Sequence, residues 1–84
     1  MSCAPACAAV AATPVTGIIQ NSREPWQVKD DRNRVFECRW VSGYNLFGRG
    51  DSVLLSDERG QVTMEGLSGP SKGKKAQVRV KLLP

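Results

Sequence analysis

After residue 14 the chain alternates between apolar and polar side chains, and this period of two is typical of strands with one buried face. The clearest run is RVFECRWV at 34–41. Its Phe36, Cys38 and Trp40 share one face, so we expect all three in a hydrophobic core. Helical periodicity is nearly absent, which makes β-structure the main expectation.

Five other segments show the same alternation, and they are 15–20, 26–29, 52–56, 61–67 and 76–83. Polar turn residues separate the strands, with tight hairpin connections expected at 30–33 and 57–60. A glycine-rich loop is expected at 42–51, with room for one helical turn around 44–47. Gly17 marks either a bulge in the first strand or a point where another backbone approaches closely.

Six short strands in roughly seventy residues, separated by turn signals, predict an all-β fold. We expect a small five- to six-stranded antiparallel barrel over 15–84, either OB-like or SH3-like. The pattern leaves the strand order and the oligomeric state open. Residues 1–14 are rich in alanine and other small side chains, so we expect them to form a disordered N-terminal arm.

Three cysteines, Cys3, Cys7 and Cys38, and the absence of a clear export signal predict reduced thiols and a cytoplasmic location. A partly cleaved export signal at the N-terminus is the alternative. Cys38 is expected to be a small core residue, and the roles of Cys3 and Cys7 are left open. No histidine is present to complete a zinc site, so no metal is expected. No apolar run reaches about eighteen residues, and no membrane partner is expected.

The net charge of +4 depends on the last fourteen residues, which hold five of the twelve basic residues and no acidic one. We expect Lys72, Lys74 and Lys75 on a flexible loop at 68–75, where backbone N–H groups of glycine and serine also face phosphate. Arg79 and Lys81 lie on the polar face of the last strand. These five residues predict a nucleic-acid-binding patch, and the alternative is that they protect an exposed sheet edge from pairing.

Two aromatic residues in the glycine-rich loop, Tyr44 and Phe47, lie near Arg49 and are candidates for stacking on bases. The alternative is that both rings close an open end of the barrel. The tripeptide Arg49-Gly50-Asp51 matches a cell-adhesion signal, but turn formation before the next strand explains it.

Catalysis has little support in this sequence. Without histidine, a serine or cysteine nucleophile lacks its usual base. The adjacent acids Asp30-Asp31 and Asp57-Glu58 lie in predicted turns, where their carboxylates are solvated and diverge. We therefore expect a protein that is not an enzyme and needs no cofactor.

Four stretches, GII at 17–19, WQVKD at 26–30, RVFECR at 34–39 and GRGDSV at 48–53, resemble the opening strands of OB-fold RNA-binding domains. They are similar in particular to the N-terminal barrel of ribosome-assembly GTPases and to translation initiation factor 1. The resemblance implies binding of structured RNA or single strands through the face near Arg34, Arg39 and the last strand. The lysine-rich loop between the last two strands departs from that pattern.

The sequence thus predicts a non-enzymatic barrel that binds RNA or single-stranded DNA through its basic C-terminal loop and strand. A protein-interaction or assembly adaptor, binding through an edge strand or the 43–51 loop, is the alternative.

Overall fold

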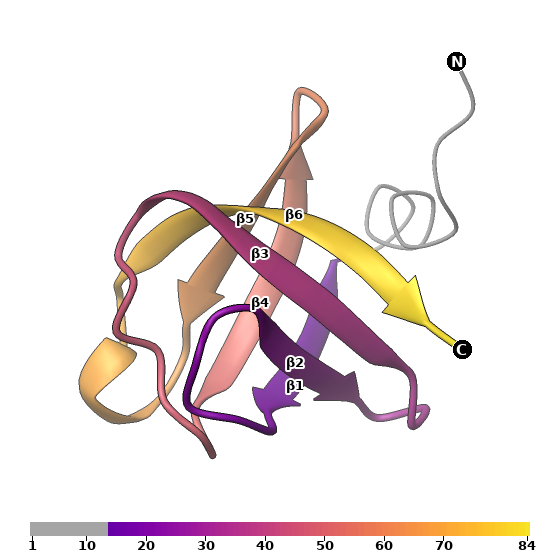
Figure 1. The fold of residues 1–84 in the computed structure, drawn as a ribbon. Helices are drawn as coiled ribbons and strands as arrows, with labels where there is room; N and C mark the ends of the chain where they lie inside the picture. The colour runs from indigo at the N-terminus through magenta and orange to yellow at the C-terminus, as the bar shows by residue number, and fades with distance from the viewer. Residues whose placement is uncertain (1–13) are drawn as a thin grey trace.

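The computed structural model describes residues 14–84, which form one closed antiparallel β-barrel (Figure 1). The elements are β1 (Val15–Ile19), β2 (Trp26–Asp30), β3 (Val35–Gly43), β4 (Ser52–Glu58), β5 (Gln61–Gly66), the single 3₁₀ turn η1 (Gly69–Ser71) and β6 (Lys75–Leu83). The predicted all-β barrel is confirmed. The predicted arm lies outside the described residues except for Pro14, as do Cys3 and Cys7.

The barrel consists of two three-stranded meanders, β1-β2-β3 and β4-β5-β6, joined along two seams by the pairs β1–β4 and β3–β6. The resulting order, β1-β2-β3-β6-β5-β4, gives each strand two neighbours and is compatible with an OB-like barrel. The expectation that β6 is an edge strand is wrong over Lys75–Val78, where β6 pairs on both sides, while Arg79 and Lys81 lie where β6 pairs with β3 alone. β6 pairs with β3 from Ala76 to Leu83, while its pairing with β5 extends only from Lys75 to Val78.

The core lies inside the barrel and is built from the apolar half of each alternating strand. Phe36 and Cys38 are fully buried there, as expected, and Trp26 is 1% exposed. Trp40 contradicts the expectation because it is 40% exposed. β2 begins at Trp26, opposite Cys38, so no strand covers β3 on that side at Trp40. The indole Nε1 donates a hydrogen bond to the carbonyl oxygen of Gly43 at 3.2 Å.

Both predicted hairpins are present. The β4–β5 connection places Arg59 and Gly60 at φ of 56° and 83°, the pair of positive values that a two-residue type I′ hairpin turn requires. The β2–β3 turn carries Asn33 at φ 62° and is fixed by the carboxylate of Asp30, which accepts hydrogen bonds from the backbone N–H groups of Arg32 and Arg34.

The helical turn allowed for around 44–47 does not form, because 44–48 run as an irregular segment along the barrel end. A short 3₁₀ turn forms elsewhere, at η1, where Pro70 restricts the backbone angle φ. Gly17 is the predicted point of close approach. A Cβ there would lie 2.6 Å from Val28 Cγ1 and 2.7 Å from the carbonyl oxygen of Lys29.

Candidate nucleic-acid interface

The loops at 44–51 and 67–74 are joined at one end of the barrel by partly buried hydrogen bonds. Ser71 Oγ donates to Asp51 Oδ2 at 2.8 Å, and Asp51 Oδ2 also accepts from the Gly48 N–H at 3.0 Å. The Ser52 N–H donates to Ser68 Oγ at 3.0 Å. The carboxylate of the Arg-Gly-Asp tripeptide therefore holds two loops together.

The segment that carries Lys72 and Lys74 has an ordered set of backbone contacts, in contrast to the flexible loop expected from its composition. The N–H groups of Lys72, Gly73 and Lys74 donate to the carbonyls of Gly69, Gly66 and Ser71 at 3.1, 2.9 and 2.9 Å. These N–H groups are thus not free to face phosphate, as the sequence suggested. The lysine side chains remain exposed and are the only part of this segment that offers positive charge.

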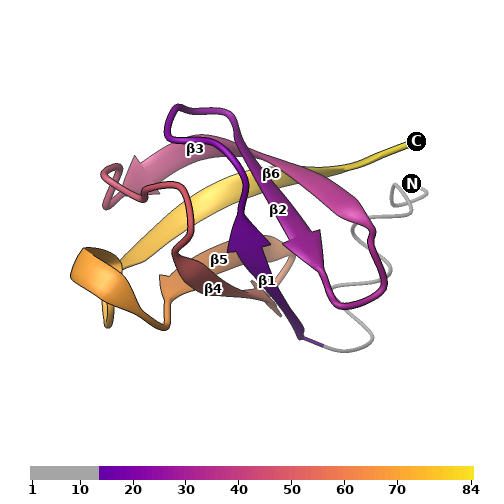
Figure 2. The ribbon, with the colours of Figure 1, turned by 90° about the horizontal axis from the view of Figure 1, so that it is seen from below.

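Four exposed basic residues form a row on the outer surface of β3 and β6, which we call the basic row; they are Arg39, Lys75, Arg79 and Lys81. Figures 1 and 2 show β3 and β6 running side by side along their length, in agreement with their pairing. Arg39 lies directly opposite Arg79 in this register. Two like charges in such a cross-strand pair repel each other.

Acidic residues flank the basic row at two points. Glu65 of β5 is opposite Lys75, and Glu37 of β3 is opposite Lys81. The Glu37 carboxylate also approaches Arg39, with 3.3 Å between Oε1 and Nε, where the Arg39 side chain is 62% exposed. At the middle of the row Arg39 is thus paired with Glu37, whereas Arg79 has no acid opposite it on β3.

The expected stacking role of Phe47 is wrong because its ring is only 2% exposed. Phe47 packs edge-to-face against Trp26 at 5.4 Å and Tyr44 at 4.9 Å between ring centroids. Its carbonyl oxygen accepts a hydrogen bond from Trp26 Nε1 at 3.1 Å. The alternative, closure of the barrel end, is thus confirmed for Phe47.

Tyr44 is partly buried and lies at the start of the basic row, since its N–H donates to the Lys75 carbonyl at 3.0 Å. Arg49 is exposed in the loop that Asp51 holds against the 67–74 segment. The structure therefore brings Tyr44 and the lysines to one barrel end, while Arg79 and Lys81 extend away along β6.

Sequence reasoning missed Trp40 as a surface aromatic residue. The signal was available in the strand lengths, because the predicted 26–29 is shorter than the predicted 34–41. A longer strand overhangs its hairpin partner at the end away from the turn, so Trp40 has no paired strand on that side, and its N–H donates to the Glu24 carboxylate at 3.3 Å instead.

Other chemistry finds no support in the described part of the chain. Burial, and secondarily the charge of Glu37, raises the pKa of the Cys38 thiol to about 12, so it is not a nucleophile near neutral pH. Residues 14–84 contain no group of three His, Cys, Asp or Glu side chains placed to hold a metal ion. The described residues include no helix that is long and apolar enough to cross a bilayer.

The geometry supports a binding surface, and the resemblance to OB-fold RNA-binding domains is upheld only as far as the barrel architecture. Comparison with protein-family models, with curated proteins and with solved structures found no match to this chain.

Proposed function

We propose that this barrel binds RNA or single-stranded DNA without catalysing a reaction. The observation that carries the proposal is the exposed cross-strand pair of Arg39 and Arg79 at the centre of the basic row. Two guanidinium groups facing each other across strands are unfavourable for folding, and a bound phosphate relieves their repulsion.

The shape of the surface favours a single strand over a duplex. Alternate side chains of β6 lie on one face about 7 Å apart, so Lys75, Arg79 and Lys81 form a line. A line of basic side chains on a sheet surface follows one extended phosphate backbone, as in other single-strand binders. Lys72 and Lys74 continue the positive charge beyond the start of β6.

The aromatic contribution in this proposal comes from Tyr44 and not from Phe47. Tyr44 is partly exposed at the start of the row, and Trp40 is a second surface ring, adjacent to Arg39 in sequence. A platform of two rings is small, so we expect phosphate contacts to dominate the affinity and to give little sequence preference.

The proposal is tested by titrating a fluorescently labelled single-stranded oligonucleotide with the protein at several salt concentrations. We expect binding at low salt and a steep loss of affinity toward physiological salt. Charge reversal at Lys74 and Lys75 should weaken binding and reduce the salt slope. Arg23→Glu, a single charge reversal in the exposed loop before β2, is the net-charge control for each single reversal at Lys74 or Lys75. No binding at low salt would contradict the proposal.

A protein partner is the second candidate, and the exposure of Leu46 favours it. Leu46 is 73% exposed in the 43–51 loop, and Val41 at the end of β3 is 39% exposed. Exposed apolar side chains mark a contact surface where they form one continuous patch, so this candidate requires Leu46 and Val41 to act together. A chain that fails to bind oligonucleotides, but binds a defined protein partner in a manner abolished by Leu46→Asp, would favour this function over the first.

A further inference from the structure

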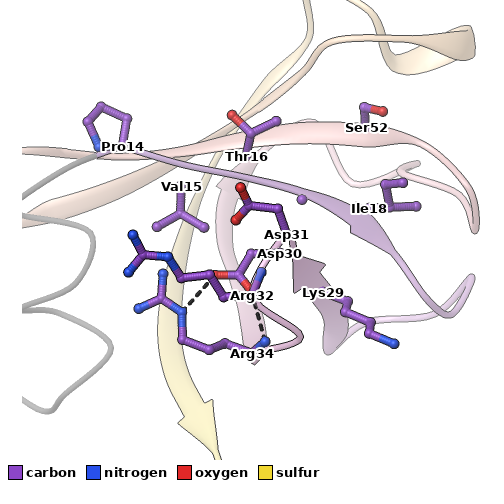
Figure 3. Close-up of a pocket in the computed structure, with 11 residues that line it drawn as sticks. Pro14, Val15, Thr16, Ile18, Lys29, Asp30, Asp31, Arg32, Arg34 and Ser52 are labelled. Atoms are coloured by element: carbon purple, nitrogen blue, oxygen red, sulfur yellow. Dashed lines mark hydrogen bonds and ion pairs between the residues drawn. The ribbon is translucent and has the colours of Figure 1, made fainter.

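A second surface feature lies away from the basic row, where β1 separates from β2. β1 pairs with β4 from Val15, but its pairing with β2 begins only at Gly17. The first residues of β1 and the β2–β3 turn therefore border a hollow of about 740 Å³ (Figure 3). This volume lies within the range of roughly 300–1,000 Å³ that small-molecule sites occupy.

The acid at the base of this hollow is already neutralised. Asp30 has a side chain only 1% exposed, and its Oδ2 is 2.7 Å from Arg34 Nε. Its Oδ1 accepts the N–H groups of Arg32 and Arg34 at 3.0 and 2.8 Å. The carboxylate of Asp30 therefore fixes the turn and is not free to repel an anion.

The two arginines of the turn still have donors to offer. Arg34 uses Nε for Asp30, and its terminal guanidinium nitrogens form no hydrogen bond with the residues that the structure describes. Arg32 is exposed and forms no ion pair with any residue that the structure describes. In Figure 3 both side chains extend toward the Val15 side of the hollow. Such donors bind oxyanions through charge-assisted hydrogen bonds.

The rest of the hollow is partly apolar. Pro14, Val15 and Ile18 contribute to its lining, and Ile18 is 49% exposed although it is a large aliphatic residue. The hydroxyls of Thr16 and Ser52 add hydrogen-bonding groups between these side chains. A ligand that fits both parts has an anionic group at one end and an apolar or aromatic group at the other.

We propose that this hollow binds a small phosphate monoester whose remaining part is apolar or aromatic, with the phosphate held by Arg32 and Arg34. A phosphate monoester has three acceptor oxygens, enough for the Arg32 guanidinium and for the terminal nitrogens of Arg34, whose charge is shared with Asp30. A carboxylate has only two acceptor oxygens for these donors. The proposal uses residues outside the basic row and does not depend on nucleic-acid binding.

Asp31 also lines the hollow, and its carboxylate points toward Thr16 in Figure 3. Its charge opposes a dianionic ligand from across the turn. Removal of the Asp31 charge should therefore strengthen phosphate binding, whereas removal of an arginine should weaken it.

The experiment follows backbone amide shifts of the full chain during titration with phenyl phosphate, and separately with inorganic phosphate and with phenol. We expect saturable shifts at 15–18 and 29–34, and phenyl phosphate to bind about tenfold more tightly than either fragment. Arg32→Ala keeps the backbone N–H bond to Asp30 and should weaken binding about tenfold. Asp31→Asn should strengthen binding about twofold.

Arg23→Ala removes an exposed arginine outside the hollow and should leave the affinity unchanged. The absence of saturable binding at millimolar phenyl phosphate would overturn the proposal. It would also be overturned if Arg32→Ala and Arg23→Ala had equal effects, or if the shifts followed β6 instead. Because the basic row is unchanged in these variants, such a failure leaves the oligonucleotide titration as a separate result.

Discussion

At the scale of single residues, two buried polar groups show that hydrogen-bond donors and a nearby charge decide whether a buried acidic group keeps its charge. Asp30 and Cys38 both lie under the barrel surface, at 6% and 0% exposure. The Asp30 carboxylate accepts three hydrogen bonds from Arg32 and Arg34 and lies beside the Arg34 charge, whereas the thiol of Cys38 has only a weak contact to the Phe36 carbonyl at 4.0 Å. The charged form is therefore supported in one case and disfavoured in the other.

Asp30→Asn should destabilise the barrel by about 2 kcal/mol, because it replaces Oδ2, which accepts from Arg34 Nε, with an NH2 group that donates, while Oδ1 can still accept the two turn bonds. Burial alone would raise the pKa of Asp30, but the hydrogen bonds from Arg34 and Arg32 and the Arg34 charge lower it below 3.8 overall. With the folded-state pKa lowered, this stability is present above the unfolded-state pKa and is lost as pH falls through the folded-state value.

Urea unfolding of both proteins at several pH values measures this effect. The difference between wild type and Asp30→Asn should be full at neutral pH and should shrink below about pH 4. A difference that stays constant down to acidic pH would contradict an ionised Asp30 as its source.

Cys38 should resist alkylation in the folded protein, since its thiol is buried and has a pKa of about 12. Iodoacetamide treatment at pH 8, followed by peptide mass mapping, should leave Cys38 unmodified until denaturant is added. The same peptide map after denaturation is the control for reagent access. Rapid native alkylation of Cys38 would show that the barrel opens at β3.

At the scale of strands, the alternation of side chains was a reliable guide because it depends on residues next to each other in the chain. Strand order depends on pairs such as β1–β4 and β3–β6, whose members are far apart in sequence, and no local pattern encodes them. The same limit explains the error at Trp40. Alternation placed Trp40 on the same face of β3 as Phe36 and Cys38. Whether a neighbouring strand covers that position depends on where β2 begins, which is at Trp26, opposite Cys38.

For the candidate site, the sequence predicted which charged residues are exposed but not which residues face one another. Exposure of the lysines followed from their charge, whereas the opposition of Arg39 and Arg79 required the register of β3 on β6. The burial of Phe47 required knowledge of Trp26 across the barrel end. The hollow beside β1 left no sequence signal, since it arises where two strands separate.

Arg79→Glu should change folding stability and oligonucleotide affinity in opposite directions. Facing Arg39 across the strands, a glutamate replaces repulsion with attraction and should add about 0.5 kcal/mol to the free energy of unfolding. The same change places negative charge in the basic row and should weaken oligonucleotide binding. Urea unfolding and the oligonucleotide titration measure the two effects, with Arg79→Gln as the neutral control. A loss of both stability and affinity would contradict the assigned register.

Gly66→Ala should disrupt the segment between β5 and β6. A Cβ at Gly66 would collide with the Ser71 carbonyl group, and Ser71 anchors that segment to Asp51. We expect a loss of about 3 kcal/mol in urea unfolding, because backbone atoms on both sides leave little room for adjustment. Gly48→Ala is the matched control, since its Cβ would meet only Asp51 Oδ2 at 3.8 Å. Equal stability of the two variants would refute this packing.

At the scale of the whole molecule, closure of the barrel makes each strand dependent on two others. β6 contributes Ala76 and Val78 to the core, and it lies between β3 and β5 and pairs with both. A small all-β domain has little stability to spare once one strand is missing.

Truncation after Lys74 should therefore prevent folding, with loss of near-ultraviolet circular dichroism from the buried Trp26. Removal of Pro84 alone, which lies beyond β6, should leave the spectrum unchanged. A truncated chain with a native spectrum would mean that the barrel does not need its β3–β6 seam.

The two-meander plan has a consequence for how the chain tolerates cleavage. Only the 44–51 segment links the first meander covalently to the second, yet the β1–β4 and β3–β6 seams hold them together along two independent lines. A single proteolytic cut after the exposed Arg49 would convert the protein into two complementary fragments held together without a covalent bond. Each fragment would supply three strands of the barrel. The barrel thus has the architecture of a split protein, in which the strand pairing at the two seams would bring the fragments together.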